Sequence, residues 1–211
     1  MRYCGDWHIR YILITHAHFD PGGEDILAAG EVKRSAEEKS KKKTLIALHP
    51  NDRHMYDHLG LQCCSFGVPL EQYVPSAKDS KDESGDVASY TLPPPDVELK
   101  DGLELSLAED SIKCKVMHTP GHSQGSCCFL LHHSGSKTAL LSSGDTLFCG
   151  SVGRSDLPGG DGAQLLQSIQ AKLYVLPDKL MVVPGHGPFT TIGHEKKSNP
   201  FVRGSRTGAR L

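Results

Sequence analysis

The sequence has 211 residues, of which 37% are hydrophobic and 23% are charged, proportions typical of a soluble protein with one large domain or two small ones. Its formal net charge of −2 favours neither nucleic acid nor an anionic membrane as a partner. No apolar run approaches the roughly 20 residues that span a bilayer, and the N-terminus lacks the apolar core of a signal peptide. We therefore expect no nucleic-acid partner and no membrane association.

The seven cysteines fit neither a disulfide framework nor a thiolate zinc knuckle. Their number is odd, two pairs are adjacent in the sequence, and no Cys-x-x-Cys occurs. Free thiols in a reducing compartment are the simplest interpretation, so the predicted location is cytoplasmic, with the mitochondrion as an alternative.

Strand and helix patterns alternate in the first part of the chain. Apolar residues 11–14 predict the end of a buried strand. Residues 24–43, rich in Ala, Glu and Lys, predict a helix or two, interrupted near Gly30. Residues 44–48 predict a second strand, and a short helix with two ordinary surface histidines follows at 54–59.

Residues 76–95 change in character, because Ser, Asp, Lys and Gly dominate before three consecutive prolines. Such a composition cannot bury much apolar surface. Since metal-type residues stand on both sides of it, we interpret it as a surface insertion within a single domain covering residues 1–211.

The remaining chain is rich in strand patterns. Alternating apolar residues favour antiparallel strands with one face on a core. The predicted strands lie at 97–99, 103–107, 112–117, 126–132, 139–142 and 180–183. Residues 161–173 predict an amphipathic helix, and no internal repeat is present.

Four times along the chain, an apolar strand ends and a His or Asp beside Gly or Pro follows at once. The residues concerned are His16, His18 and Asp20, then His122, Asp145 and His186. Imidazole and carboxylate are ligands that zinc prefers, and strand ends can hold ligands precisely. Each motif alone is also compatible with a polar turn that carries solvated histidines. Together, the four predict a metal site.

These motifs resemble those of the metallo-β-lactamase superfamily, most closely its glyoxalase II (hydroxyacylglutathione hydrolase) branch of the short, single-domain type. The matching stretches are THAHFD at 15–20, TPGHS at 119–123, GDTLF at 144–148, PGHG at 184–187, GRSDLPGGD at 153–161 and NPF at 199–201. The resemblance implies an α/β fold, a four-layer αββα sandwich with the metals at the sheet edges.

The resemblance also implies a site with two metal ions, Zn²⁺ in the first instance, with Fe or Mn as alternatives. The first metal would be held by His16, His18 and His122. The second would be held by Asp20 and His186, with Asp145 bridging both, so that Asp20 and Asp145 are also the catalytic residues. Metal coordination lowers the pKa of water from about 16 to about 7, which would generate the nucleophile. His118 is interpreted as a supporting residue, and Arg154 and Asp156 as residues that pin their loop.

Two departures from the family pattern bear on this prediction. Pro21 stands where the family has a further histidine, so the second metal site is expected to be weak. Only fifteen residues precede His16, whereas the family places a strand-rich segment there. We therefore expect the N-terminal strands to be missing, as in a truncated chain.

The predicted activity is hydrolysis of a thioester of the S-D-lactoylglutathione type, with a small glutathione conjugate as the substrate. One alternative is a persulfide dioxygenase with one iron. Against it, the dioxygenases that resemble this fold carry Ala-His-Asp-Tyr at the position where this chain has Pro-Gly-His-Gly-Pro (184–188). The other alternative is an inactive or truncated paralogue. The sequence predicts no oligomeric state.

Overall fold

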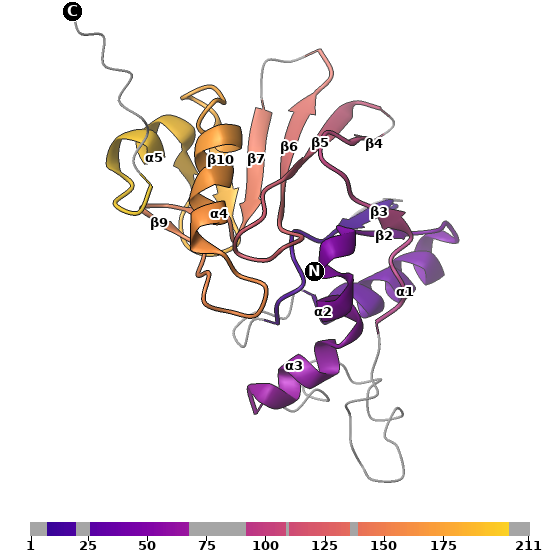
Figure 1. The fold of residues 1–211 in the computed structure, drawn as a ribbon. Coiled ribbons are helices and arrows are strands. Elements are labelled where there is room, and N and C mark those ends of the chain that lie inside the picture. The colour runs from indigo at the N-terminus through magenta and orange to yellow at the C-terminus, as the bar shows by residue number, and fades with distance from the viewer. Residues whose placement is uncertain (1–7, 20–25, 68–91, 109, 136–138, 203–211) are drawn as a thin grey trace, which may run out of the picture. The chain divides into compact units, whose positions relative to one another are not determined.

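The computed structural model describes residues 8–19, 26–67, 92–108, 110–135 and 139–202. The chain divides into two compact units, Met1–Leu99 and Lys100–Leu211 (Figure 1). The single-domain assignment stays a prediction. Among the described residues, no helix combines the length and the apolar character that crossing a membrane requires.

Unit 1 contains a three-stranded parallel sheet with the order β1-β2-β3. Its strands are β1 (Tyr11–Leu13), β2 (Leu45–Leu48) and β3 (Val97–Glu98). Its helices are α1 (Ala28–Ser40), the 3₁₀ turn η1 (Pro50–Asp52), α2 (Arg53–Asp57) and α3 (Leu59–Ser65). The core between sheet and helices is apolar and includes Leu27, Ile46 and Tyr56, each fully buried.

Two expectations for unit 1 were wrong in detail. Helix α1 runs without interruption through Gly30, which is buried. Pro93 packs so closely against this position that an added Cβ would lie 3.1 Å from its Cδ, which accounts for a glycine inside the helix. Strand β3 pairs parallel to β2 rather than antiparallel. Most of the predicted insertion lies outside the described residues, so it stays a prediction; in its described part, Leu92 is buried in the core.

Unit 2 contains a six-stranded sheet with the order β11-β10-β7-β6-β5-β4 and a two-stranded hairpin, β8-β9. The strands are β4 (Glu104–Leu107), β5 (Ile112–His118), β6 (Cys127–His133), β7 (Ala139–Gly144), β8 (Leu147–Phe148), β9 (Ser151–Val152), β10 (Met181–Pro184) and β11 (Thr190–Thr191). The helices are α4 (Gly162–Ser168), its π-helical continuation η5 (Ile169–Leu173) and α5 (Ile192–Ser198).

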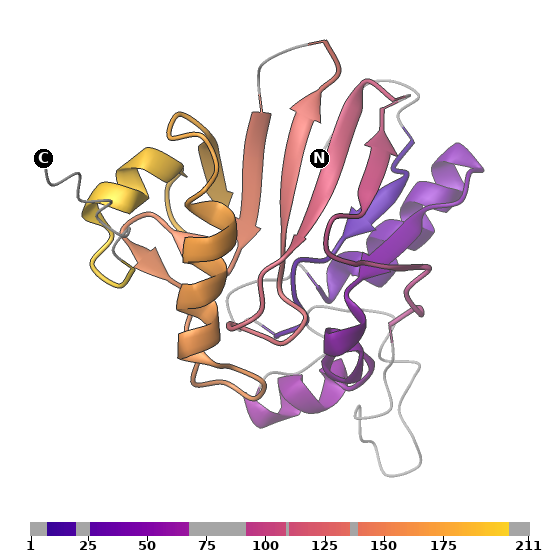
Figure 2. The ribbon, with the colours of Figure 1, turned by 45° about the horizontal axis from the view of Figure 1, so that its top comes forward.

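The predicted helix at 161–173 is confirmed as α4 and η5. Asp161 caps it, because its carboxylate accepts a hydrogen bond from the Gln164 N–H (3.0 Å). Its apolar face is buried against the sheet in the second core cluster, as Leu165, Ile169 and Leu173 show. Figure 2 shows α4 lying along the sheet of unit 2. A mixed α/β class is therefore confirmed.

Strand direction in unit 2 decides where the strand-end residues meet. Strand β6 is antiparallel to both β5 and β7, and β7 is parallel to β10. Strands β5, β7 and β10 therefore run in the same direction, and their carboxyl ends lie at one edge of the sheet. His122, Asp145 and His186 follow those three ends.

The cysteines of the described residues are all free thiols, as the sequence predicted. Burial raises the pKa of Cys63, Cys114 and Cys128 to about 11. These thiols are therefore protonated and inert at neutral pH.

Asp96 joins three segments of unit 1 and makes its stability depend on pH. Its carboxylate contacts the ammonium groups of Lys33 (2.5 Å) and Lys43 (2.9 Å) and accepts the Ile46 N–H (3.1 Å). Burial alone would raise its pKa, but these three partners outweigh burial and lower it from 3.8 to about 2. The stabilisation is thus complete above about pH 4 and is lost as the pH falls towards 2.

We predict that Asp96→Asn lowers the free energy of unfolding by about 2 kcal/mol at neutral pH. The difference from the wild type should shrink as the pH falls towards 2, where the Asp96 carboxylate becomes protonated. Urea unfolding across this pH range measures it, and Asp57→Asn, in the exposed pair with Arg53, is the control. An equal loss at both pH values would contradict the assignment.

Candidate metal centre

The turn after β1 presents the two histidines of unit 1. Ala17 lies between them and is fully buried. Its N–H donates to the carboxylate of Asp52 on η1 (3.0 Å), and its carbonyl accepts from the Gln62 amide on α3 (3.0 Å). The imidazole rings of His16 and His18 have centroids 5.6 Å apart. The backbone between the predicted ligands is thus fixed on both of its polar groups.

Gln62 anchors the same turn at further points. Its Oε1 accepts the Phe19 N–H (3.1 Å), and its Nε2 also donates to the Met55 carbonyl (2.9 Å). The Thr15 hydroxyl lies 3.0 Å from Nδ1 of His16 and orients that ring. Asp20 and Pro21 lie outside the described residues, so the predicted ligand and the predicted departure at these positions stay predictions.

In unit 2, the three strand-end residues meet at the Asp145 carboxylate. Its Oδ2 lies 3.8 Å from Nε2 of His122 and 3.6 Å from Nε2 of His186. His122 is buried, Asp145 is 13% exposed, and His186 is 55% exposed. The cluster is thus buried on the His122 side and open to solvent on the His186 side.

The orientation of the His122 ring follows from its second nitrogen. Nδ1–H donates to the main-chain carbonyl of Arg154 (2.7 Å), so the neutral ring carries its lone pair on Nε2. That lone pair and the carboxylate oxygen are both electron donors, and their separation exceeds hydrogen-bonding distance. A cation between them satisfies both, and the donor set of imidazole and carboxylate fits an ion of the zinc type.

Two glycines allow the backbone to pack against Asp145. A Cβ added at Gly185 would clash with Oδ1 of Asp145, and one added at Gly153 would clash with the Asp145 carbonyl. Any side chain at either position would therefore displace the residue on which the cluster is built.

The loop carrying His122 is fastened by polar residues that the sequence did not single out as functional. The Ser123 and Ser126 hydroxyls hydrogen-bond (2.7 Å), as do those of Thr119 and Thr146 (3.0 Å). The Ser168 hydroxyl on α4 donates to the Pro120 carbonyl (2.7 Å). Hydroxyl residues of this kind are common in ordinary turns, so their pattern gave no signal for a site.

His118, Arg154 and Asp156 lie beside this loop. His118 donates from Nε2 to the Gln124 carbonyl (2.9 Å), which fastens the β5–β6 loop. Arg154 forms a fork with Asp156 (2.8 and 2.9 Å), and this pairing lowers the pKa of Asp156 to about 2. Both side chains are exposed. Arg154 contacts His122 through its carbonyl, a contact that the sequence could not reveal.

Known proteins are similar to this chain in sequence and in fold. No family model matches the chain. The hydroxyacylglutathione hydrolase GloC of Haemophilus influenzae is 30% identical over 198 residues, which are 93% of this chain and 77% of that protein.

Two solved structures match most of the chain. The crystal structure of TTHA1623 in a di-iron-bound form is 32% identical, with a TM-score of 0.66, over 91% of this chain and 77% of that one. The BLEG-1 B3 metallo-β-lactamase is 34% identical, with a TM-score of 0.64, over 92% of this chain and 78% of that one.

The chain therefore belongs to the metallo-β-lactamase superfamily of metal-dependent hydrolases, as its motifs predicted. The α/β fold class is confirmed by the same neighbours. The chain spans 64%, 77% and 75% of the length of three curated relatives that it matches. Those proteins are longer, so their activity is not established for this chain by the similarity.

We predict that Gln62→Leu destabilises the protein by about 1–3 kcal/mol, because the Ala17 carbonyl and the Phe19 N–H lose their partner. Urea unfolding measures the change. Gln167→Leu, at an exposed position of α4, is the matched control and should change stability little. Equal effects of the two substitutions would show that the turn does not depend on the Gln62 amide.

Gly185→Ala tests the packing around Asp145. An added Cβ must push the carboxylate aside, and overpacking of this kind costs about 1–3 kcal/mol, so zinc affinity should fall roughly ten- to a hundredfold. Gly102→Ala, in a turn where the Cβ meets nothing but the backbone φ is +78°, should lower stability and leave zinc affinity unchanged. Calorimetric titration distinguishes the two, and an unchanged affinity in Gly185→Ala would contradict the prediction.

Proposed function

We propose that this protein is a metal-dependent thioester hydrolase that acts on a hydroxyacylglutathione of the S-D-lactoylglutathione type. The observation that carries the proposal is the Asp145 carboxylate facing Nε2 of both His122 and His186. The similarity to GloC supports glutathione thioesters as the substrate class. Water would add across the C–S bond, so that a hydroxy acid and the glutathione thiol leave.

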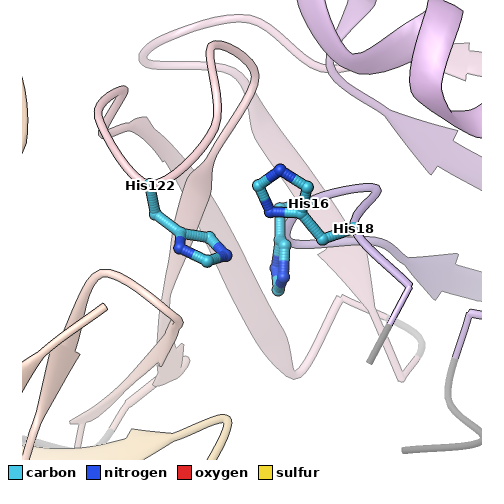
Figure 3. A group of neighbouring side chains, drawn as sticks. All are labelled: His16, His18 and His122. Atoms are coloured by element: carbon cyan, nitrogen blue, oxygen red, sulfur yellow. The ribbon is translucent and has the colours of Figure 1, made fainter. Parts of the chain in front are cut away.

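The proposed ligands are those that the family motifs imply. His16, His18 and His122, the three imidazoles labelled in Figure 3, would hold the first metal. Asp20 and His186 would hold the second, and Asp145 would bridge both. Zinc is the proposed metal, and the di-iron form of TTHA1623 makes iron the principal alternative.

The bound metal would supply an acidified water and a positive charge for the carbonyl oxygen. The protein's own groups do the positioning. The Arg154 carbonyl keeps the proton of His122 on Nδ1, so Nε2 stays a donor to metal. The Phe148 and His186 rings form a T-shaped pair (centroids 6.0 Å apart, 79°), which orients the exposed imidazole. Asp145, only partly exposed, would accept a hydrogen bond from the attacking water.

Hydrolysis of S-D-lactoylglutathione by zinc-loaded protein tests the proposal. We predict that His122→Ala and Asp145→Asn each lower kcat/KM by more than about a hundredfold, beyond the range typical of supporting residues. Zinc content per chain should fall in parallel. His133→Ala, an exposed histidine on β6, should leave both quantities unchanged.

Protein that binds zinc or iron but hydrolyses no member of a panel of acylglutathiones would contradict the proposal. Oxygen consumption with glutathione persulfide in the same preparation would identify the rival dioxygenase. Zinc content unchanged in both His122→Ala and Asp145→Asn would show that the metal lies elsewhere.

A further inference from the structure

Unit 2 contains a second group of metal-type side chains, away from the strand-end cluster. Cys149 lies in the two-residue turn between β8 and β9, and His194 and Glu195 are consecutive residues of α5. One ligand atom from each of the three lies within 4.8 Å of the others. We propose that Cys149, His194 and Glu195 form a separate binding site for a thiophilic divalent cation of the zinc type.

The Glu195 carboxylate is the fixed part of this site. It is fully buried, and it accepts hydrogen bonds from the Thr190 hydroxyl (2.5 Å), the Gly150 N–H (3.0 Å) and the Asn199 amide (2.8 Å). These donors satisfy its lone pairs only in part and leave its negative charge in a buried position. A buried carboxylate is stable when a cation or a metal accompanies it.

The negative charge of Glu195 affects the ionisation of a neighbouring tyrosine. Burial, together with this charge, raises the pKa of the Tyr174 phenol. Among the described residues, the basic side chain within 4.0 Å of the Glu195 carboxylate is that of His194, whose Nε2 lies 4.0 Å from Oε1. Imidazole binds zinc in its neutral form, so a cation at this point would form metal–ligand bonds to both the His194 ring and the Glu195 carboxylate.

The other two ligands have room to adjust. His194 is exposed (58%) and Cys149 is half-buried in a hairpin turn. Atoms bound to one tetrahedral zinc ion lie about 3.6 Å apart when sulfur and nitrogen are the ligands. Binding would therefore require these two side chains to move closer to Glu195 from the present spacing of up to 4.8 Å.

The ligand types define which cation the site would take. A thiolate selects zinc over magnesium, calcium and manganese, whereas the proposed catalytic ligands are only imidazoles and carboxylates. Three protein ligands leave a fourth position for water. On binding, the Cys149 thiol loses its proton to solvent, so affinity should rise with pH.

A bound ion would connect the β8–β9 hairpin to α5, which already meet through the Gly150 N–H and Glu195. Cys149 follows Asp145 by four residues. Occupancy of this site would therefore brace the segment that carries Asp145, although the two sites share no residue.

Titration of the 211-residue protein with Co²⁺ tests the site by its sulfur ligand. A thiolate–cobalt charge-transfer band in the near ultraviolet is expected for the wild type, and Cys149→Ser should abolish it. Cys64→Ser, at an exposed cysteine of α3, should retain the band. A wild type without the band, or a band that survives Cys149→Ser, would overturn the proposal.

Two further measurements complete the test. His194→Ala should weaken Co²⁺ binding at this band roughly ten- to a hundredfold, whereas His133→Ala should not, and equal affinities would count against the site. In unmutated protein, Zn²⁺ should slow alkylation of Cys149 but not of Cys64. Equal alkylation rates with and without Zn²⁺ would overturn the proposal, even if Cys149→Ser failed to fold.

Discussion

The common direction of β5, β7 and β10 is the constraint on which the candidate site of unit 2 depends. Strand β6 runs opposite to its neighbours β5 and β7, and β10 pairs parallel to β7. Three carboxyl ends therefore share one edge, although the residues that follow them lie far apart in the sequence. Reversal of any one of these strands would remove its ligand from the edge.

Hydrogen bonds to the main chain and close packing, rather than ion pairs, set the precision of the site. The Arg154 carbonyl orients His122, and Gly185 lets Asp145 approach the turn after β10. In unit 1, Asp52 and Gln62 hold the backbone between the two histidines. These supporting groups are uncharged or paired with backbone N–H groups, so screening by salt should affect them little.

The sequence was most informative where residue type alone determines the chemistry. His16, His18, His122, Asp145 and His186 were all predicted to follow strand ends, and the described structure places each there. The superfamily followed from the same motifs. The longer strands of unit 2 (β4, β5, β6, β7 and β10) and the helix at 161–173 were predicted because their apolar periodicity matches their burial. The two-residue strands β8, β9 and β11 are too short to show a periodicity and were not predicted.

What the sequence could not give depends on contacts between distant segments. Gly30 resembles a helix breaker, but it lies inside α1 because Pro93 packs against it. The parallel pairing of β3 with β2 is set by the crossover, not by the alternation of its residues. The sequence did not indicate the role of Gln62 and Asp52 in holding the Ala17 backbone. A glutamine on a surface helix and an aspartate after a strand are common without any such role.

Anomalous diffraction from zinc-loaded crystals tests the central claim most directly. The account predicts a zinc peak bonded to Oδ2 of Asp145 and Nε2 of His122, at about 2.0–2.2 Å from each. A structure with zinc bound only elsewhere, and with the Asp145 carboxylate and the His122 ring free of metal at saturating zinc, would contradict it.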